Sequence, residues 1–223
     1  MNPQPPAYAS LVLPGRFRAA VFDMDGLLLD TEPMWNDAER ELLERHGETF
    51  TEADLIASAP LSLGETAALY SERLGRSARD IEQELSELML ARYVSGAPLC
   101  PCAQALVEAL DGRMLMAVAS NTTRAHVRQA LDAVGLVTLT LIASATDLGS
   151  PKPAPDAYLE ACRLLEVGPI DTVAFEDSPV GIQAAKAAGL FAVGISRFDG
   201  VELQTAGADL VFGSLCQVVT EPA

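Results

Sequence analysis

The chain has 223 residues, of which 49% are hydrophobic and 21% are charged, and its net charge is −16. This length accommodates one hydrophobic core and a smaller accessory unit. The acidic balance argues against nucleic acid and membranes as partners. No apolar run approaches the roughly 20 residues of a membrane helix, and the Pro-rich residues 1–15 predict a flexible tail rather than a signal peptide. We therefore expect a cytoplasmic protein.

The first part of the chain predicts one strand followed by a block of helices. Arg18–Phe22 is a short apolar run that is typical of a buried strand. Apolar residues at helical spacing then recur in three segments, with no strand pattern among them: Trp35–His46, Glu65–Leu74 and Ala78–Val94. The Gly- and Pro-rich segment Gly96–Ala103 indicates a linker.

The second part predicts strands that alternate with helices. The predicted strands are Leu115–Ala119, Leu139–Ala143, Thr172–Phe175, Leu190–Ile195 and Asp209–Phe212. The predicted helices are Thr123–Val134, Asp156–Leu165 and Pro179–Ala188. This alternation favours a parallel sheet covered on both faces. We predict an α/β, Rossmann-like core (residues 16–34 and 104–223) with an inserted small all-helical cap domain (residues 35–103).

The four cysteines show no paired metal-binding motif. Cys100 and Cys102 form an isolated C-x-C pair, and the chain has only two histidines, which argues against a structural zinc site. We expect buried free thiols in a reducing compartment. No heptad or interface pattern is visible, so we expect a monomer.

Polar side chains follow four of the predicted elements, where the carboxyl ends of parallel strands meet at one edge of the sheet. They belong to Asp23-Met24-Asp25-Gly26, Ser120-Asn121-Thr122, the loop around Lys152, and Glu176-Asp177-Ser178. Clustered carboxylates stay ionised together only with a cation among them. Oxygen ligands without histidine or cysteine suit Mg²⁺. A metal, a lysine and a hydroxyl at a helix N-terminus together indicate phosphoryl transfer.

These motifs, in this order, resemble those of the haloacid dehalogenase superfamily, from about Phe17 to Phe212. The nearest subgroup contains β-phosphoglucomutase and the small sugar-phosphate phosphatases, and the run Gly26–Trp35 resembles the phosphatases in particular. The resemblance implies a magnesium-dependent phosphatase that hydrolyses a small phosphorylated metabolite through an aspartyl-phosphate, with a sugar phosphate as the candidate substrate.

The resemblance also assigns roles to individual residues. It implies that Asp23 is the nucleophile, that Asp25 is the general acid and base, and that Lys152 stabilises the transferred charge. Phosphate contacts are expected from Ser120, Asn121, Lys152 and Met24. The implied Mg²⁺ ligands are Asp23, the backbone carbonyl of Asp25, and Asp177, with Glu176 as a further ligand or as the charge partner of Lys152.

Two other functions remain open at this stage. A β-phosphoglucomutase-type phosphotransferase needs a cation in the cap for a second phosphate, and the corresponding segment holds Ala59 and Ser62 instead of the family's glycine and arginine. A non-catalytic phosphometabolite-binding protein on the same fold is the second alternative. His126 is expected on the surface, and Trp35 is expected either to pack in the core and linker or to contact the substrate.

Overall fold

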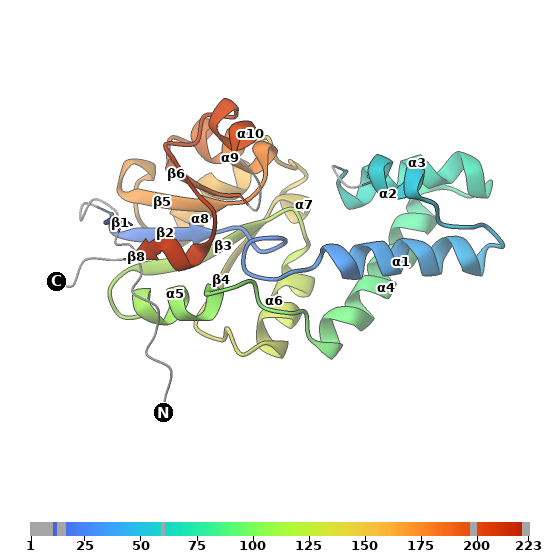
Figure 1. The fold of residues 1–223 in the computed structure, drawn as a ribbon, viewed down its shortest axis with the longest axis horizontal. Coiled ribbons are helices and arrows are strands. Elements are labelled where there is room, and N and C mark those ends of the chain that lie inside the picture. The colour runs from blue at the N-terminus through green and yellow to red at the C-terminus, as the bar shows by residue number, and fades with distance from the viewer. Residues whose placement is uncertain (1–10, 13–16, 59–60, 197–199, 220–223) are drawn as a thin grey trace.

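The computed structural model describes residues 11–12, 17–58, 61–196 and 200–219. Its centre is a six-stranded parallel sheet in the order β4-β3-β2-β5-β6-β7, shown in Figure 1. The strands are β2 (Ala19–Phe22), β3 (Leu115–Ser120), β4 (Leu141–Ser144), β5 (Thr172–Glu176), β6 (Phe191–Ile195) and β7 (Leu210–Phe212). The predicted α/β class is confirmed.

Two hydrophobic cores lie on opposite faces of this sheet. Along β2, Ala20 and Phe22 belong to one core, and Ala19 and Val21 belong to the other, because successive side chains alternate between faces. Buried side chains of α5 (Ala103–Leu110) and α6 (Arg124–Ala133) complete the first core. The second core is completed by α8 (Asp156–Leu165), α9 (Pro179–Ala187) and α10 (Val201–Thr205).

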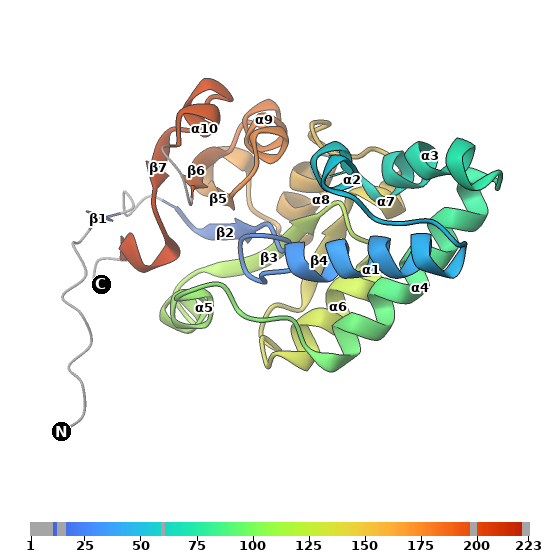
Figure 2. The same ribbon diagram turned by 45° about the vertical axis from the view of Figure 1, so that its right-hand side comes forward.

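Four helices form a unit beyond the carboxyl ends of the strands, which we call the cap (Figures 1 and 2). They are α1 (Glu32–Arg45), α2 (Glu52–Ser58), α3 (Leu63–Leu74) and α4 (Ala78–Ser95). Helix-capping side chains fix where two of these helices start. Ser62 and Glu65 form a reciprocal capping box at the N-terminus of α3, and Ser77 is the N-cap residue of α4. The chain leaves the sheet after β2, builds the cap and returns through residues 96–102 to α5.

Several short elements were not predicted from the sequence. They are helices α2, α5, α7 (Ala145–Leu148) and α10, and the 3₁₀ turns η1 (Pro169–Asp171) and η2 (Leu215–Gln217). Each has eight residues or fewer, which is too short for a clear periodic pattern in the sequence. The predicted tail lies outside the described residues except for Leu11–Val12, which forms β1 and pairs with β8 (Val218–Val219). Within the described residues, every helix is too short or too polar to span a lipid bilayer.

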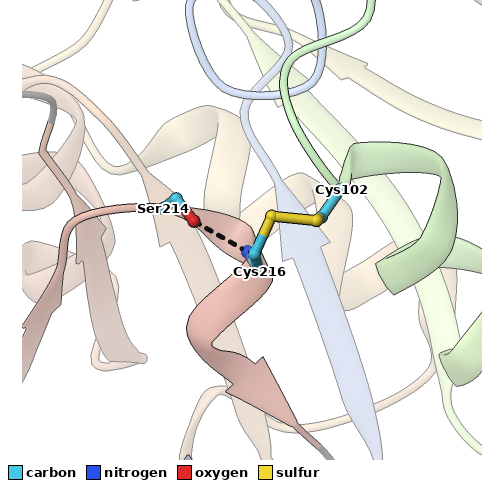
Figure 3. Close-up of a disulfide and its surroundings, with 3 residues drawn as sticks. All are labelled: Cys102, Ser214 and Cys216. Atoms are coloured by element: carbon cyan, nitrogen blue, oxygen red, sulfur yellow. Dashed lines mark hydrogen bonds between the residues drawn. A yellow bond between two sulfur atoms is a disulfide. The ribbon is translucent and has the colours of Figure 1, made fainter. Parts of the chain in front are cut away.

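The expectation of four free thiols is wrong for two of the cysteines. Cys102, at the start of α5, forms a disulfide with Cys216 in η2 (Figure 3), and their Cα atoms lie 5.1 Å apart. Cys100 and Cys162 are free and buried, as expected. The two bonded residues are 114 positions apart in the chain, so only the docking of the C-terminal segment beside α5 brings them together. The disulfide removes the thiol-based argument for a reducing compartment.

Candidate active site

Lys152 lies buried between two carboxylates at the carboxyl edge of the sheet. Its Nζ donates to Asp23 Oδ1 at 2.6 Å, to Glu176 Oε1 at 2.5 Å and to the carbonyl oxygen of Ala119 at 2.9 Å. These three bonds use all the donors of an ammonium group. Burial alone would lower the pKa of Lys152, but the two adjacent carboxylates raise it above its ordinary value. The ammonium is therefore a fixed positive charge beside Asp23.

Glu176, the last residue of β5, has hydrogen bonds to both carboxylate oxygens. Oε1 accepts from Lys152 and from the Tyr158 hydroxyl at 2.7 Å, and Oε2 accepts from Ser178 Oγ at 3.0 Å. A Cβ atom at Gly181 would lie 1.9 Å from the carboxyl group, so only glycine leaves room for it there. This geometry supports Glu176 as the charge partner of Lys152.

Asp25, two residues after Asp23, receives hydrogen bonds from both the core and the cap. Its Oδ1 accepts from the hydroxyls of Thr31 at 2.9 Å and Tyr93 at 3.0 Å. Its Oδ2 accepts from the hydroxyls of Thr122 at 2.9 Å and Ser120 at 3.3 Å. Because Tyr93 belongs to cap helix α4, the side chain of Asp25 is fixed jointly by the cap and the sheet.

Three carboxylates form a group that could hold a metal ion. Asp23, Glu176 and Asp177 each place an oxygen within 4.8 Å of the others. Burial raises the pKa of Asp177 to about 7, with Glu176 adding to the effect and Lys152 opposing it. Burial also raises the pKa of Asp23, again against Lys152. A bound cation would offset the cost of burying these carboxylates in their ionised form. An all-oxygen donor set suits Mg²⁺, so the residues present fit the predicted ion.

A glycine lets the chain pass close to this group. Gly26 has a φ of +86°, which L-residues rarely adopt, and a Cβ atom there would lie 2.0 Å from Asp177 Oδ2. The turn that follows Asp25 therefore requires glycine for both its conformation and its space. The side chain of Asp25 lies outside the three-carboxylate group, and its contacts are the hydroxyls described above.

The predicted phosphate-binding residues are arranged in different ways. The Ser120 hydroxyl is fully buried, where it bonds Asp25 and accepts from the Thr122 backbone N–H at 2.9 Å. Asn121 lines the cavity described below, and its Oδ1 accepts from the Lys152 backbone N–H at 2.9 Å. The Met24 side chain is fully buried in the hydrophobic core, so a phosphate contact from this residue would involve its backbone.

A cavity of about 450 Å³ lies between this cluster and the cap. Asp23, Asp25, Lys152 and Asp177 line its sheet side. Residues of α1, α3 and α4 line its cap side, together with Ser58 of α2. Trp35 lines the cavity and also packs against the hydrophobic core, so both of its expected roles are compatible with its position.

The expectation that His126 lies on the surface is wrong. Its ring is buried between the core and the cap, with Nδ1 3.0 Å from Thr123 Oγ1 and Nε2 3.4 Å from Ser86 Oγ. Burial lowers the pKa of His126, although the nearby Asp25 and Asp147 oppose this. The surface expectation rested on the charged neighbours Arg124 and Arg128 on the same helix. The sequence does not indicate that α4 packs against His126.

Comparisons with known proteins identify the family of the chain. The family of haloacid dehalogenase-like hydrolases matches residues 17–189. The chain is 30% identical to a validoxylamine A 7'-phosphate phosphatase of Streptomyces hygroscopicus subsp. limoneus, over 91% of this chain and 96% of that protein. It is 31% identical to a fructose-1-phosphate phosphatase of Escherichia coli, over 81% of this chain and 97% of that protein.

A solved structure extends the likeness to three dimensions. The protein CbbY of Rhodobacter sphaeroides, crystallised in complex with phosphate, superposes with a TM-score of 0.77 at 26% identity, covering 90% of this chain and 96% of that one. The chain therefore belongs to the haloacid dehalogenase-like hydrolases, and its named phosphatase relatives place it among the phosphoric monoester hydrolases of that family.

Proposed function

We propose that the protein is a magnesium-dependent phosphatase that hydrolyses a small sugar or polyol phosphate through an aspartyl-phosphate on Asp23. The observation that carries this proposal is the buried Asp23, which has Lys152 at 2.6 Å and lines the cavity between sheet and cap together with Asp25. Two-step phosphoryl transfer requires a carboxylate nucleophile beside a fixed cation and a second carboxyl group that can act as acid and base. Asp23, Lys152 and Asp25 fit these roles.

In the first step an oxygen of Asp23 forms a bond to phosphorus, and the bond between phosphorus and the leaving oxygen breaks. Asp25 gives its proton to that leaving oxygen. In the second step Asp25 takes a proton from water, the water oxygen bonds to phosphorus, and the bond to Asp23 breaks. The hydroxyls of Thr31 and Tyr93 orient Asp25 for both proton transfers.

The electrostatics of the first step require positive charge, because a carboxylate must approach an anionic phosphoryl group. Lys152 supplies one such charge beside Asp23. Asp23, Asp177 and the carbonyl of Asp25 would hold Mg²⁺, which would supply further charge neutralisation when bound. Glu176 and Tyr158 keep the ammonium of Lys152 in position.

The substrate class is supported by what the relatives act on. Their names specify phosphate esters of carbohydrates or carbohydrate-like alcohols, including fructose 1-phosphate and validoxylamine A 7'-phosphate. The mutase alternative is less well supported, because it needs a cationic site in the cap for a second phosphate. Ser62 there is the N-cap of α3, and Ala59 lies outside the described residues.

The test is phosphate release from a panel of hexose, pentose, polyol and two-carbon acid phosphates. The concentration of each ester is varied across the KM values common for enzymes, about 1 μM to 1 mM. We expect release that stops in EDTA and returns with Mg²⁺. Phosphate release that persists without any divalent ion would contradict the carboxylate-cluster argument. Release from no ester, together with tight phosphate binding, would favour the non-catalytic alternative.

A further inference from the structure

The cap side of the cavity combines apolar, polar and acidic side chains and offers little positive charge. Of the described residues that line the cavity, Lys152 is the only lysine or arginine, and its donors are already bonded to the carboxylates of the sheet edge. His126 also lines the cavity, but burial lowers its pKa and so favours the neutral ring. The cap contributes polar and acidic side chains: Glu32, Asn36, Glu39, Ser58, Ser62 and Glu65.

Glu39 differs from the other carboxylates of α1 because it is buried, with 4% of its surface exposed. Its Oε2 accepts a hydrogen bond from the Tyr70 hydroxyl at 2.6 Å. Burial raises the pKa of Glu39, while the neighbouring hydroxyls of Ser58 and Tyr70 oppose this. No lysine, arginine or histidine among the described residues pairs with it. A buried carboxyl group without a cation destabilises the fold, so its place on the cavity wall suggests a role toward a ligand.

Ser58, the last residue of α2 and a neighbour of Glu39, provides a second observation on the same wall. It is 4% exposed and lines the cavity. Its hydroxyl makes no hydrogen bond of ordinary geometry to any described residue. Buried hydroxyls are nearly always bonded, because an unpaired one costs free energy. A polar group of a ligand in the cavity would satisfy it.

We propose that Glu39 and Ser58 recognise the leaving group of the substrate, and that they select a non-anionic group that donates hydrogen bonds. This inference rests on the phosphatase activity proposed above. Hydroxyl groups of a sugar or polyol can donate to Glu39, and an ammonium group can do so with added charge attraction. A carboxylate or second phosphate would instead face Glu39 without a cation, which is a like-charge contact that disfavours binding.

Three phosphate esters on one carbon skeleton test the proposal: glucosamine 6-phosphate, glucose 6-phosphate and 6-phosphogluconate. Each kcat/KM is measured with Mg²⁺ and divided by the value for p-nitrophenyl phosphate, whose leaving group has no amino or alcohol group. We expect the wild type to prefer the amino and neutral esters over the gluconate by about 100-fold, since like-charge contacts cost several kcal/mol. Glu39→Gln should narrow this preference to about tenfold or less.

The matched control is Glu44→Gln, which removes the same charge from the exposed side of the same helix. It should leave the preference within about twofold of the wild type. An unchanged preference in Glu39→Gln, or a wild type that prefers the gluconate, would overturn the proposal. Ser58→Ala is the second variant, for use if Glu39→Gln does not fold. It should lower kcat/KM for glucose 6-phosphate about fivefold or more relative to p-nitrophenyl phosphate, and no change would also count against the proposal.

Hydrolysis of p-nitrophenyl phosphate distinguishes a failure of the recognition proposal from a failure of the proposed phosphatase function. If the wild type hydrolyses p-nitrophenyl phosphate but does not discriminate among the three sugar esters, the phosphatase function stands and the recognition role of Glu39 falls. If the wild type releases phosphate from none of these four esters and from no ester of the wider panel above, the proposed function itself fails.

Discussion

The variant Lys152→Met tests how much the fold depends on the buried ion pairs of Lys152 with Asp23 and Glu176. The lysine side chain is 3% exposed, and the side chains of its partners Asp23 and Glu176 are 10% and 0% exposed. Methionine fills similar space but leaves two buried carboxylates facing each other. Removing one member of a buried ion pair costs about 3–5 kcal/mol. For a chain of this size each kcal/mol lowers the Tm by about 2–4 °C, so we expect a loss of about 6–20 °C.

The chain contains its own control, because Lys186 is the only other lysine. Its Nζ pairs with Asp209 at 2.6 Å, but its side chain is 34% exposed. Lys186→Met should cost about 0–1 kcal/mol. Thermal unfolding of both variants is followed by circular dichroism in EDTA at neutral to alkaline pH. Equal losses in the two variants would refute the reasoning about burial. At acidic pH the loss in Lys152→Met should shrink, because Asp23 has a raised pKa and takes up a proton.

Two further predictions concern the neighbours of this ion pair. The pKa of Asp177 is about 7 in the folded protein and 3.8 in ordinary surroundings, so between these pH values the folded state binds more protons than the unfolded state. In EDTA the free energy of unfolding, measured by urea titration, should therefore fall as pH rises from about 4 to 7. Mg²⁺ should flatten this slope. A free energy of unfolding that rises across this range would contradict the burial of Asp177. Gly181→Ala should displace Glu176, because the new Cβ would lie 1.9 Å from its carboxyl group, with a cost of about 1–3 kcal/mol and a loss of kcat. Gly64→Ala in α3, where the nearest atom is 3.9 Å away, is the control and should be neutral or stabilising by up to about 1 kcal/mol; similar unfolding curves for the two variants would contradict the steric argument.

The sheet and its polar edge were accessible from the sequence because both have local signals. Apolar runs such as Ala19–Phe22 and Thr172–Glu176 are buried on both faces, which gives them an unbroken hydrophobic pattern. Helix α8 begins and ends where it was predicted, from Asp156 to Leu165. Parallel topology then places the strand ends at one edge, so Asp23, Lys152 and Glu176 were expected to meet, and they do.

What the sequence did not indicate depends on contacts between distant segments. Tyr93 reaches Asp25 across 68 positions, and the Cys102–Cys216 disulfide spans 114. Both require the final placement of the cap or of the C-terminal segment, and neither has a motif. The sequence likewise presents Glu39 as an ordinary polar residue of an amphipathic helix. In the structure it is buried and bonded to Tyr70, 31 positions away.

The most direct test of the proposed mechanism is detection of the phosphorylated enzyme. The protein is mixed with its best ester and Mg²⁺, quenched with acid within one turnover, digested and analysed by mass spectrometry. We expect the mass of an added phosphoryl group on the peptide that contains Asp23. The variant Asp23→Asn should still fold, but it should show neither the added mass nor turnover. Full turnover in Asp23→Asn, or a phosphoryl group on a different residue, would contradict the account.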